Sequence, residues 1–259
     1  MRDGDRLILT CLGLAVLLVV LDGLTRGGVA GWAQTHLPGI AHTFGLWAGR
    51  IGLVLAPLAV LPLITGILGR FVTLPGICWT LHDTLIRGIE TLTRSIGGAA
   101  RWFALGLVVV TAVIVVQRYV FGFASTKLQE SVIYMHALLF LLASASALLN
   151  GGHVRVDVFY SKASDKAKAW VDLFGTYLAL IPMSALILWS STGYMASAWR
   201  ILERSRESDG LPFVFLLKTA IPLFAILMII QGVAMAARAA MTLAGQKTPE
   251  LPASLEAEV

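Results

Sequence analysis

The chain has 259 residues, of which 57% are hydrophobic and only 14% are charged, and its formal net charge is +5. A soluble domain carries about 25% charged residues, so this composition excludes a water-soluble fold and predicts an integral membrane protein. The basic residues are scattered over several loops rather than clustered, which argues against a nucleic-acid-binding protein. Such a positive balance suits loops that face anionic membrane lipids.

The apolar segments predict α-helices. They are continuous blocks of Leu, Val, Ile and Ala, without the alternation typical of outer-membrane strands. The expected fold class is therefore an all-α integral membrane protein, because a helix of about 20 apolar residues crosses the hydrocarbon core. The chain has only two cysteines, which excludes a disulfide framework and forms no metal-binding motif. Expected spans lie at 7–24, 46–68, 102–120, 129–149, 170–198 and 213–237.

The first span could be read as a signal peptide, since a basic start precedes an apolar core. Residues 22–26 lack the small-x-small cleavage pattern, however, and the core is long, so a retained helix is favoured. The mixed segment 27–44 suits a membrane interface. In the second span, Pro57 and Pro62 each remove a backbone donor and are expected to kink the helix.

Residues 74–96 follow a different pattern. Apolar residues recur three and four positions apart between charged residues, which predicts an amphipathic helix lying in the membrane surface. Pro75 near its start suits the first helical turn. The alternative is a connecting helix packed on the protein's own loops. The apolar positions are Leu74, Ile77, Cys78, Leu81, Leu85, Ile89 and Leu92.

The distribution of charge predicts an orientation. With six spans and a cytoplasmic N-terminus, the inner segments hold the larger share of the 20 Lys and Arg residues. Segments 70–101 and 150–168 decide this balance. The positive-inside rule therefore predicts that both termini, including the polar tail 241–259, lie in the cytoplasm.

A polar ribbon lies between two long apolar runs. Gly151 and Gly152 offer a flexible exit from the preceding helix. His153, Arg155 and Asp157 alternate with valines, so their side chains share one face of an extended segment. A metal or catalytic site would need His153 and Asp157 to act together, but no further His or carboxylate cluster lies nearby. We expect no metal, cofactor or catalytic residue here. Instead, we expect these residues to form an elbow, a structured connection that fixes the positions of two helices or docks on another subunit or on lipid headgroups.

Five other polar or proline positions are candidates for subunit or lipid contacts. Arg118 ends a span as an interface anchor. Glu130 lies near a helix N-terminus, where the dipole favours a carboxylate, or else it contacts a partner. Lys218, about one turn before Pro222, can extend its amine toward the membrane surface or serve a contact. Gln231 lies deeper and needs a hydrogen-bond partner, for which another helix is a candidate.

The spans lack the features of a carrier that works alone. No span carries a ladder of ionisable groups, and no matched pair of broken helices marks a substrate site in mid-membrane. For this reason a self-contained secondary carrier is only the second hypothesis for the function of this chain, behind the one given by the motifs below. A membrane enzyme that uses His153 and Asp157 is the third.

Several motifs occur in order along residues 101–240: Gln117–Gly122, Glu130, Asn150–Tyr160, Leu211-Pro212, Leu217-Lys218, Ile221-Pro222 and Gln231-Gly232. This set resembles the small membrane subunit of tripartite ATP-independent periplasmic (TRAP) transporters, the DctQ-like family. Many members have a tryptophan and paired acids at the start of the second core helix, where this chain has Lys127–Glu130. Residues 1–100 lie outside the family pattern and would form an N-terminal membrane extension.

The resemblance implies a four-helix, non-catalytic small subunit in the bacterial inner membrane. Its partners would be a large multi-span permease subunit and a periplasmic substrate-binding protein. The large subunit would move substrate, commonly an organic acid, together with sodium ions by an elevator motion. The small subunit would act as a fixed scaffold.

Overall fold

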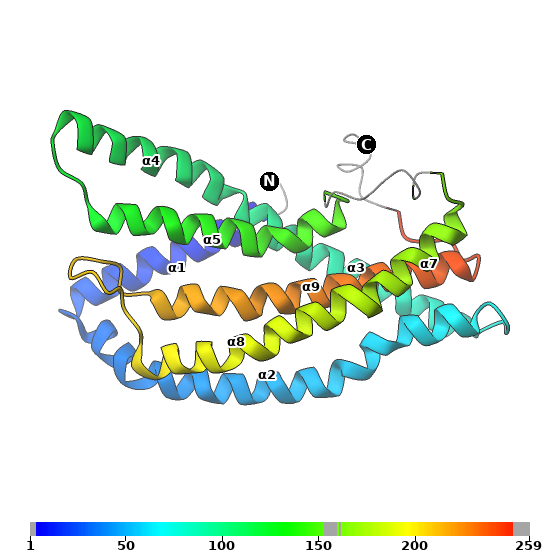
Figure 1. Ribbon diagram of the computed structural model, residues 1–259. Helices are drawn as coiled ribbons and strands as arrows, with labels where there is room; N and C mark the ends of the chain where they lie inside the picture. Colours follow the sequence, from blue (N-terminus) through cyan, green and yellow to red (C-terminus); the bar gives the residue numbers. More distant parts are fainter. Residues whose placement is uncertain (1–3, 153–159, 161, 251–259) are drawn as a thin grey trace. The chain divides into compact units, whose positions relative to one another are not determined.

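The computed structural model describes residues 4–152, 160 and 162–250, and every regular element within them is helical (Figure 1). The elements are α1 (Asp5–Leu24), α2 (Gly28–Leu68), α3 (Gly76–Ala100), α4 (Trp102–Val120), α5 (Thr126–Leu149), α7 (Asp165–Gly175), the π-helical turn η1 (Thr176–Leu180), α8 (Ile181–Ile201) and α9 (Val214–Leu243).

The described residues contain six helical runs that are long and apolar enough to cross a membrane. These runs are α1, α2, α3 with α4, α5, α7 through α8, and α9. The prediction of an all-α protein with six apolar helical runs is thereby confirmed.

Helix α2 differs from the sequence prediction, because it runs unbroken for 41 residues and includes the segment expected to be a separate interface. Several of its polar side chains bond to carbonyls of their own helix and so do not interrupt it. Thr35 and Thr43 each donate to the carbonyl four residues earlier, at 3.1 and 3.0 Å. A ring nitrogen of His36 lies 2.9 Å from the Trp32 carbonyl oxygen. Helices satisfy their backbone internally, which favours one continuous helix in a low-dielectric environment.

Local signals set several helix ends. Ser164 caps α7, where its hydroxyl accepts the Ala167 amide at 3.3 Å. Gly151 has a φ of 68°, in the left-handed region that favours glycine. The Gly152 amide then donates to the Ala147 carbonyl at 2.8 Å, which closes α5 with a Schellman-type cap. The expected glycine exit from this helix is confirmed.

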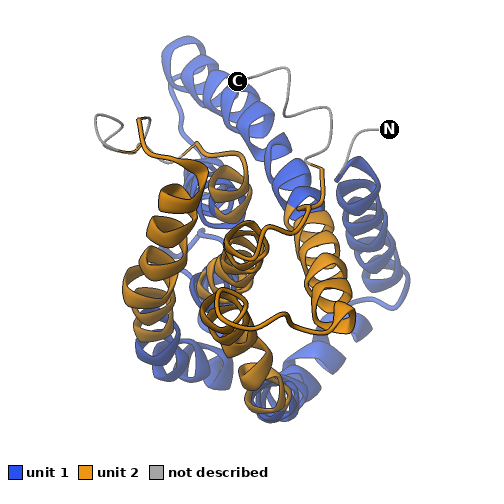
Figure 2. Ribbon diagram, turned by 90° about the vertical axis from the view of Figure 1, so that its right-hand side faces the viewer, with its two compact units in different colours: residues 1–50, 94–144, 187–224 blue, residues 51–93, 145–186, 225–259 orange. Residues whose placement is uncertain are grey.

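The chain divides into two compact units, coloured separately in Figure 2. Unit 1 comprises residues 1–50, 94–144 and 187–224, and unit 2 comprises residues 51–93, 145–186 and 225–259. Each unit combines segments from the first hundred residues with segments from the rest of the chain.

In unit 1, the N-terminal helix is tied to a later one by polar contacts. The Asp5 carboxylate accepts hydrogen bonds from Arg101 and from the Trp102 indole, both at 3.2 Å. Helices α1 and α4 otherwise have no buried residue, and their exposed side chains are almost all apolar. Such surfaces suit contact with lipid chains or with another membrane subunit.

In unit 2, the C-terminal part of α9 is the centre of the packing. Its small side chains let other helices approach closely. A Cβ atom on Gly66 of α2 would lie only 3.3 Å from Ala240, and one on Gly232 of α9 would lie 2.8 Å from Leu180. The buried core cluster contains Ala169, Leu173, Ala236, Ala239 and Leu243.

Candidate functional site

Among the described residues, two clusters of polar side chains connect segments that are far apart in the sequence, one cluster in each unit. The Glu130 cluster in unit 1 consists of Lys127, Glu130, Tyr194, Glu203, Ser205, Asp209, Leu211 and Lys218. The Glu90 cluster in unit 2 consists of Thr65, His82, Glu90, Thr93, Gln231 and Arg238.

Glu130 holds the loop that joins α8 to α9. Its carboxylate accepts a hydrogen bond from the Ser205 hydroxyl and, at 2.5 Å, another from the Leu211 amide. The Ser205 amide donates in turn to the Leu211 carbonyl at 3.1 Å. Hydrogen bonds to an ionised acceptor are roughly twice as strong as neutral ones. Glu130 therefore fastens both sides of loop 202–213 to the start of α5.

Lys218 fastens the same loop from α9. Its amine lies 2.5 Å from a Glu203 carboxylate oxygen and 3.9 Å from the centroid of the Tyr194 ring. The Lys218 side chain is only 15% exposed. Water screens such a pair less than an exposed one, and the aromatic face adds a cation–π attraction. Of the two roles left open for Lys218, the structure supports a contact, which is made to this chain's own loop.

The base of loop 202–213 is packed as well as bonded. The Trp199 indole N–H donates to the Thr219 hydroxyl at 2.7 Å. The same indole meets the Phe215 ring edge to face, with 4.8 Å between centroids. The pair of Lys127 with Asp209 is exposed at 2.7 Å, so it contributes little.

In the Glu90 cluster, Gln231 has the hydrogen-bond partner that a polar side chain inside an apolar helix needs. The Thr93 hydroxyl donates to the Gln231 side-chain oxygen at 2.9 Å, and both residues are 1% exposed. The expectation that another helix supplies this partner is confirmed, and the helix is α3.

An ion pair lies beside that hydrogen bond. The Arg238 guanidinium donates to both carboxylate oxygens of Glu90, at 2.6 and 2.8 Å, and the Glu90 side chain is 4% exposed. A third bond runs from Arg238 to the Pro249 carbonyl at 2.7 Å. Two-pronged geometry and additional hydrogen bonds are what a buried ion pair needs to offset its desolvation.

His82 links α3 to α2 in the same unit. One ring nitrogen lies 2.9 Å from the Thr65 hydroxyl and the other lies 2.7 Å from the Cys78 carbonyl oxygen. Along the sequence of α3, partners on α9 occur in descending order, since Glu90 meets Arg238 and Thr93 meets Gln231. Within unit 2, α3 therefore runs antiparallel to α9.

The side chains of α3 divide into two stripes. The stripe of His82, Ile86, Glu90 and Thr93 is buried. The predicted apolar stripe points elsewhere: Ile77 is 76% exposed and Leu81 is 40% exposed. Thus α3 packs on α2 and α9 through a mainly polar stripe, whereas Ile77, Leu81 and Leu92 of its apolar stripe are left exposed.

Sequence reasoning missed Glu90, Arg238, His82 and Thr93 as partners. The available signal was the spacing of 82, 86, 90 and 93, which puts these residues on one helix face. The charges on that face were interpreted only as the polar side of an amphipathic helix.

The remaining residues singled out from the sequence do not belong to either cluster. Arg118 is exposed in the last turn of α4, where a cation complements the helix dipole. Pro222 lies buried inside an unbroken α9. His153, Arg155 and Asp157 lie outside the described residues.

Tyr160, which follows these residues, makes a contact with α7 that the sequence did not predict. The Tyr160 hydroxyl donates to the Asp172 carboxylate of α7 at 2.9 Å.

Comparison with known proteins places these helices in a family. The family model of the DctQ component of tripartite ATP-independent periplasmic transporters matches residues 107–242, which is more than half of the chain. The chain belongs to the DctQ family. This protein is thus the small permease component of a TRAP transporter. No curated protein and no solved structure matches the chain significantly.

The two polar clusters relate differently to the DctQ match. The Glu130 cluster lies wholly within residues 107–242, whereas the Glu90 cluster crosses its boundary. Gln231 and Arg238 belong to the matched region, and Thr93 and Glu90 precede it. Buried polar bonds therefore join the N-terminal residues of this DctQ protein to its family region.

Proposed function

We propose that this DctQ protein is a non-catalytic scaffold for a large multi-span permease subunit in a sodium-driven uptake system. The system would take up a small organic acid or a similar solute delivered by a periplasmic substrate-binding protein. The observation that carries this proposal is which partners the ionisable side chains of α3 and α9 bind. Glu90, Arg238 and Lys218 bind partners within the chain. A carrier would instead direct such groups into a water-filled pathway.

The loop 202–213 is the proposed outer surface of the subunit. Glu130 and Lys218 fasten it, and Arg204 and Arg206 are exposed on it. A pre-ordered loop loses little conformational entropy when a partner binds. The periplasmic binding protein is the proposed partner, with both termini of the chain in the cytoplasm of a bacterial cell and the spans in its inner membrane.

Residues 1–100 are proposed to act as a structural extension of the four-helix domain at 101–240. Within unit 2, the buried bonds of Glu90 and Thr93 support this role. The exposed apolar stripe of α3 supports a position at the membrane boundary, where it would meet lipid. The predicted elbow at His153, Arg155 and Asp157 would hold the neighbouring helices at one depth.

Reconstitution tests the proposal. Tagged full-length chain, expressed with the permease and binding-protein genes of the same transporter, is expected to co-purify with the large subunit. Proteoliposomes with both membrane subunits and the binding protein should take up solute with an inward sodium gradient. Proteoliposomes with this chain alone should take up none. Sodium-driven uptake by the chain alone would instead establish a self-contained carrier.

A further inference from the structure

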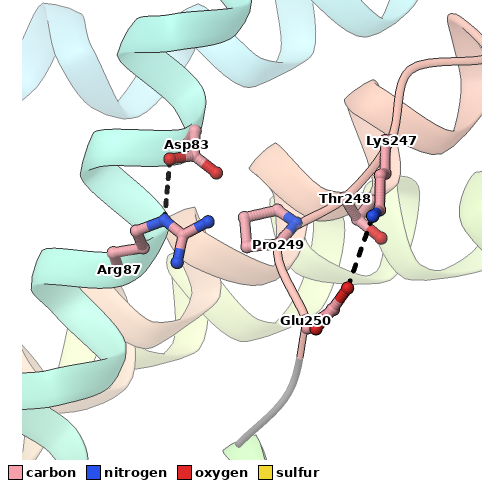
Figure 3. A pocket seen from close by; sticks show the side chains of 6 residues that line it. All are labelled: Asp83, Arg87, Lys247, Thr248, Pro249 and Glu250. Carbon is pink, nitrogen blue, oxygen red and sulfur yellow. Dashed lines mark hydrogen bonds and ion pairs between the residues drawn. The ribbon is translucent and has the colours of Figure 1, made fainter.

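A small charged cavity lies in unit 2, between α3 and the segment that follows α9 (Figure 3). Its volume is about 290 Å³, near the lower end of ligand-binding pockets. Helix α3 supplies one wall and the chain after α9 supplies the other. The lining residues are Asp83, Arg87, Lys247, Thr248, Pro249 and Glu250.

The second wall is held in place by a buried ion pair. Arg238, which Glu90 binds through both carboxylate oxygens, donates to the Pro249 carbonyl at 2.7 Å. That bond fixes the segment around Pro249 opposite α3. The cavity is therefore built on the same contacts that join α3 to α9.

Each wall presents one cation and one anion. On α3, Arg87 bonds to Asp83 through Nε at 2.8 Å, and on the other wall Lys247 lies 3.3 Å from Glu250. The Arg87 bond leaves the guanidinium's four Nη hydrogens as donors, a geometry that suits phosphate oxygens. The Lys247 amine is a second donor for phosphate. The carboxylates of Asp83 and Glu250 can accept hydrogen bonds from an ammonium group.

We propose that this cavity binds the phosphoethanolamine headgroup of a zwitterionic phospholipid. The phosphate contacts Arg87 and Lys247, and the ammonium contacts Asp83 and Glu250. A purely anionic headgroup would bring further negative charge beside these two carboxylates, whereas the ammonium group of a zwitterion would add an attraction to them. The mixed charge of the cavity therefore favours a zwitterion.

The surface of α3 beside the cavity explains why the ligand is a lipid rather than a free solute. Between Arg87 and the exposed apolar residues Ile77 and Leu81, the helix presents Thr80 and Thr84. Both threonine hydroxyls donate to carbonyls of their own helix, at 3.2 and 2.9 Å, so their methyl groups face outward. Acyl chains attached to a bound headgroup thus have an apolar surface to lie on.

Native mass spectrometry of the full-length protein in detergent tests this site. The probes are dilauroyl phosphatidylethanolamine, dilauroyl phosphatidylglycerol and soluble phosphorylethanolamine. The wild-type protein should retain the ethanolamine lipid in preference to the glycerol lipid. The double variant Arg87→Gln/Lys247→Gln should lower that retention about fivefold, as expected for the loss of two largely exposed charge contacts.

A matched variant separates the site from a general loss of charge. Arg70→Gln/Lys166→Gln removes two exposed cations of the same unit that do not line the cavity, and it should retain the lipid like the wild type. Thermal unfolding of both variants checks that each is folded. Equal retention in all three proteins, or equal retention of the two lipids, would overturn the proposal. Binding of phosphorylethanolamine without the lipid would overturn the assignment to a lipid.

Discussion

Glu90 of α3 and Arg238 of α9 are 148 positions apart in the sequence, yet they form a two-pronged ion pair at 2.6 and 2.8 Å. One partner precedes the DctQ match and the other lies inside it. The pair therefore joins residues that precede the match to the C-terminal part of α9, and both lie in unit 2. Its energetic role can be tested directly.

Replacing Glu90 by Gln should lower the free energy of unfolding by about 3–5 kcal/mol, because it leaves the partly buried Arg238 charge without its counter-ion. The measurement is equilibrium unfolding of the purified protein in detergent micelles. The double variant Glu90→Met/Arg238→Met should regain most of the loss, since removing both charges leaves none unpaired. Asp83→Asn, which breaks only the exposed pair with Arg87, should leave stability close to that of the wild type. A loss of similar size in all three variants would contradict this account.

Thr93→Val keeps the shape of the side chain but removes the hydroxyl that bonds to Gln231. The unpaired Gln231 amide should reduce the free energy of unfolding by about 1–3 kcal/mol. Combining Thr93→Val with Gln231→Leu should restore part of that loss, because no buried polar group is left unpaired. Additive losses in the double variant would show that the two side chains act independently.

Glu130→Ala should release loop 202–213, since it removes two hydrogen bonds to an ionised acceptor. Trypsin should then cut after Arg204 at least about tenfold faster than in the wild type, which reflects a larger open population. Lys127→Ala, which removes only the exposed contact with Asp209, should stay within about twofold of wild type. If Glu130→Ala is cleaved at the wild-type rate, the carboxylate does not hold the loop.

Gly232→Ala should be less stable than Gly193→Ala by about 1–3 kcal/mol, because the new Cβ would lie 2.8 Å from Leu180 and force that side chain to move. Gly193→Ala is the matched control. Apart from the adjacent backbone of its own helix, nothing lies within 4 Å of the position of its Cβ, and alanine favours the helix. The control should be neutral or slightly stabilising in the same unfolding assay. Equal effects at the two glycines would rule out close packing as the reason for Gly232.

Arg155→Ala and Asp157→Ala test the proposed elbow. Each is expected to reduce the yield of the complex with the large subunit, or the rate of uptake, without changing which solute is preferred. Co-purification yield and uptake with a panel of organic acids are the measurements. Wild-type yield and uptake in both variants would remove the elbow from the proposal.

The number of apolar helical runs and the helix end at Gly151 could be predicted because the signals are local. Apolar length decides whether a helix can cross the hydrocarbon core, and a glycine pair after a helix supplies a left-handed cap. The continuity of α2 could not be predicted from the same signals. Its threonines and His36 look polar in sequence, but they bond to their own helix carbonyls.

The sequence by itself determined the membrane class, the helical runs and the family motifs around Glu130 and Gln231. Only the tertiary structure decided the partners of those residues. It also showed that the buried stripe of α3 is the one containing His82 and Glu90, while Ile77 and Leu81 are left exposed. The physical reason is that helix pairing depends on register between segments far apart in the chain, which no local pattern encodes. The sequence pattern of a polar helix face is the same whether its side chains form hydrogen bonds with water or with a second helix.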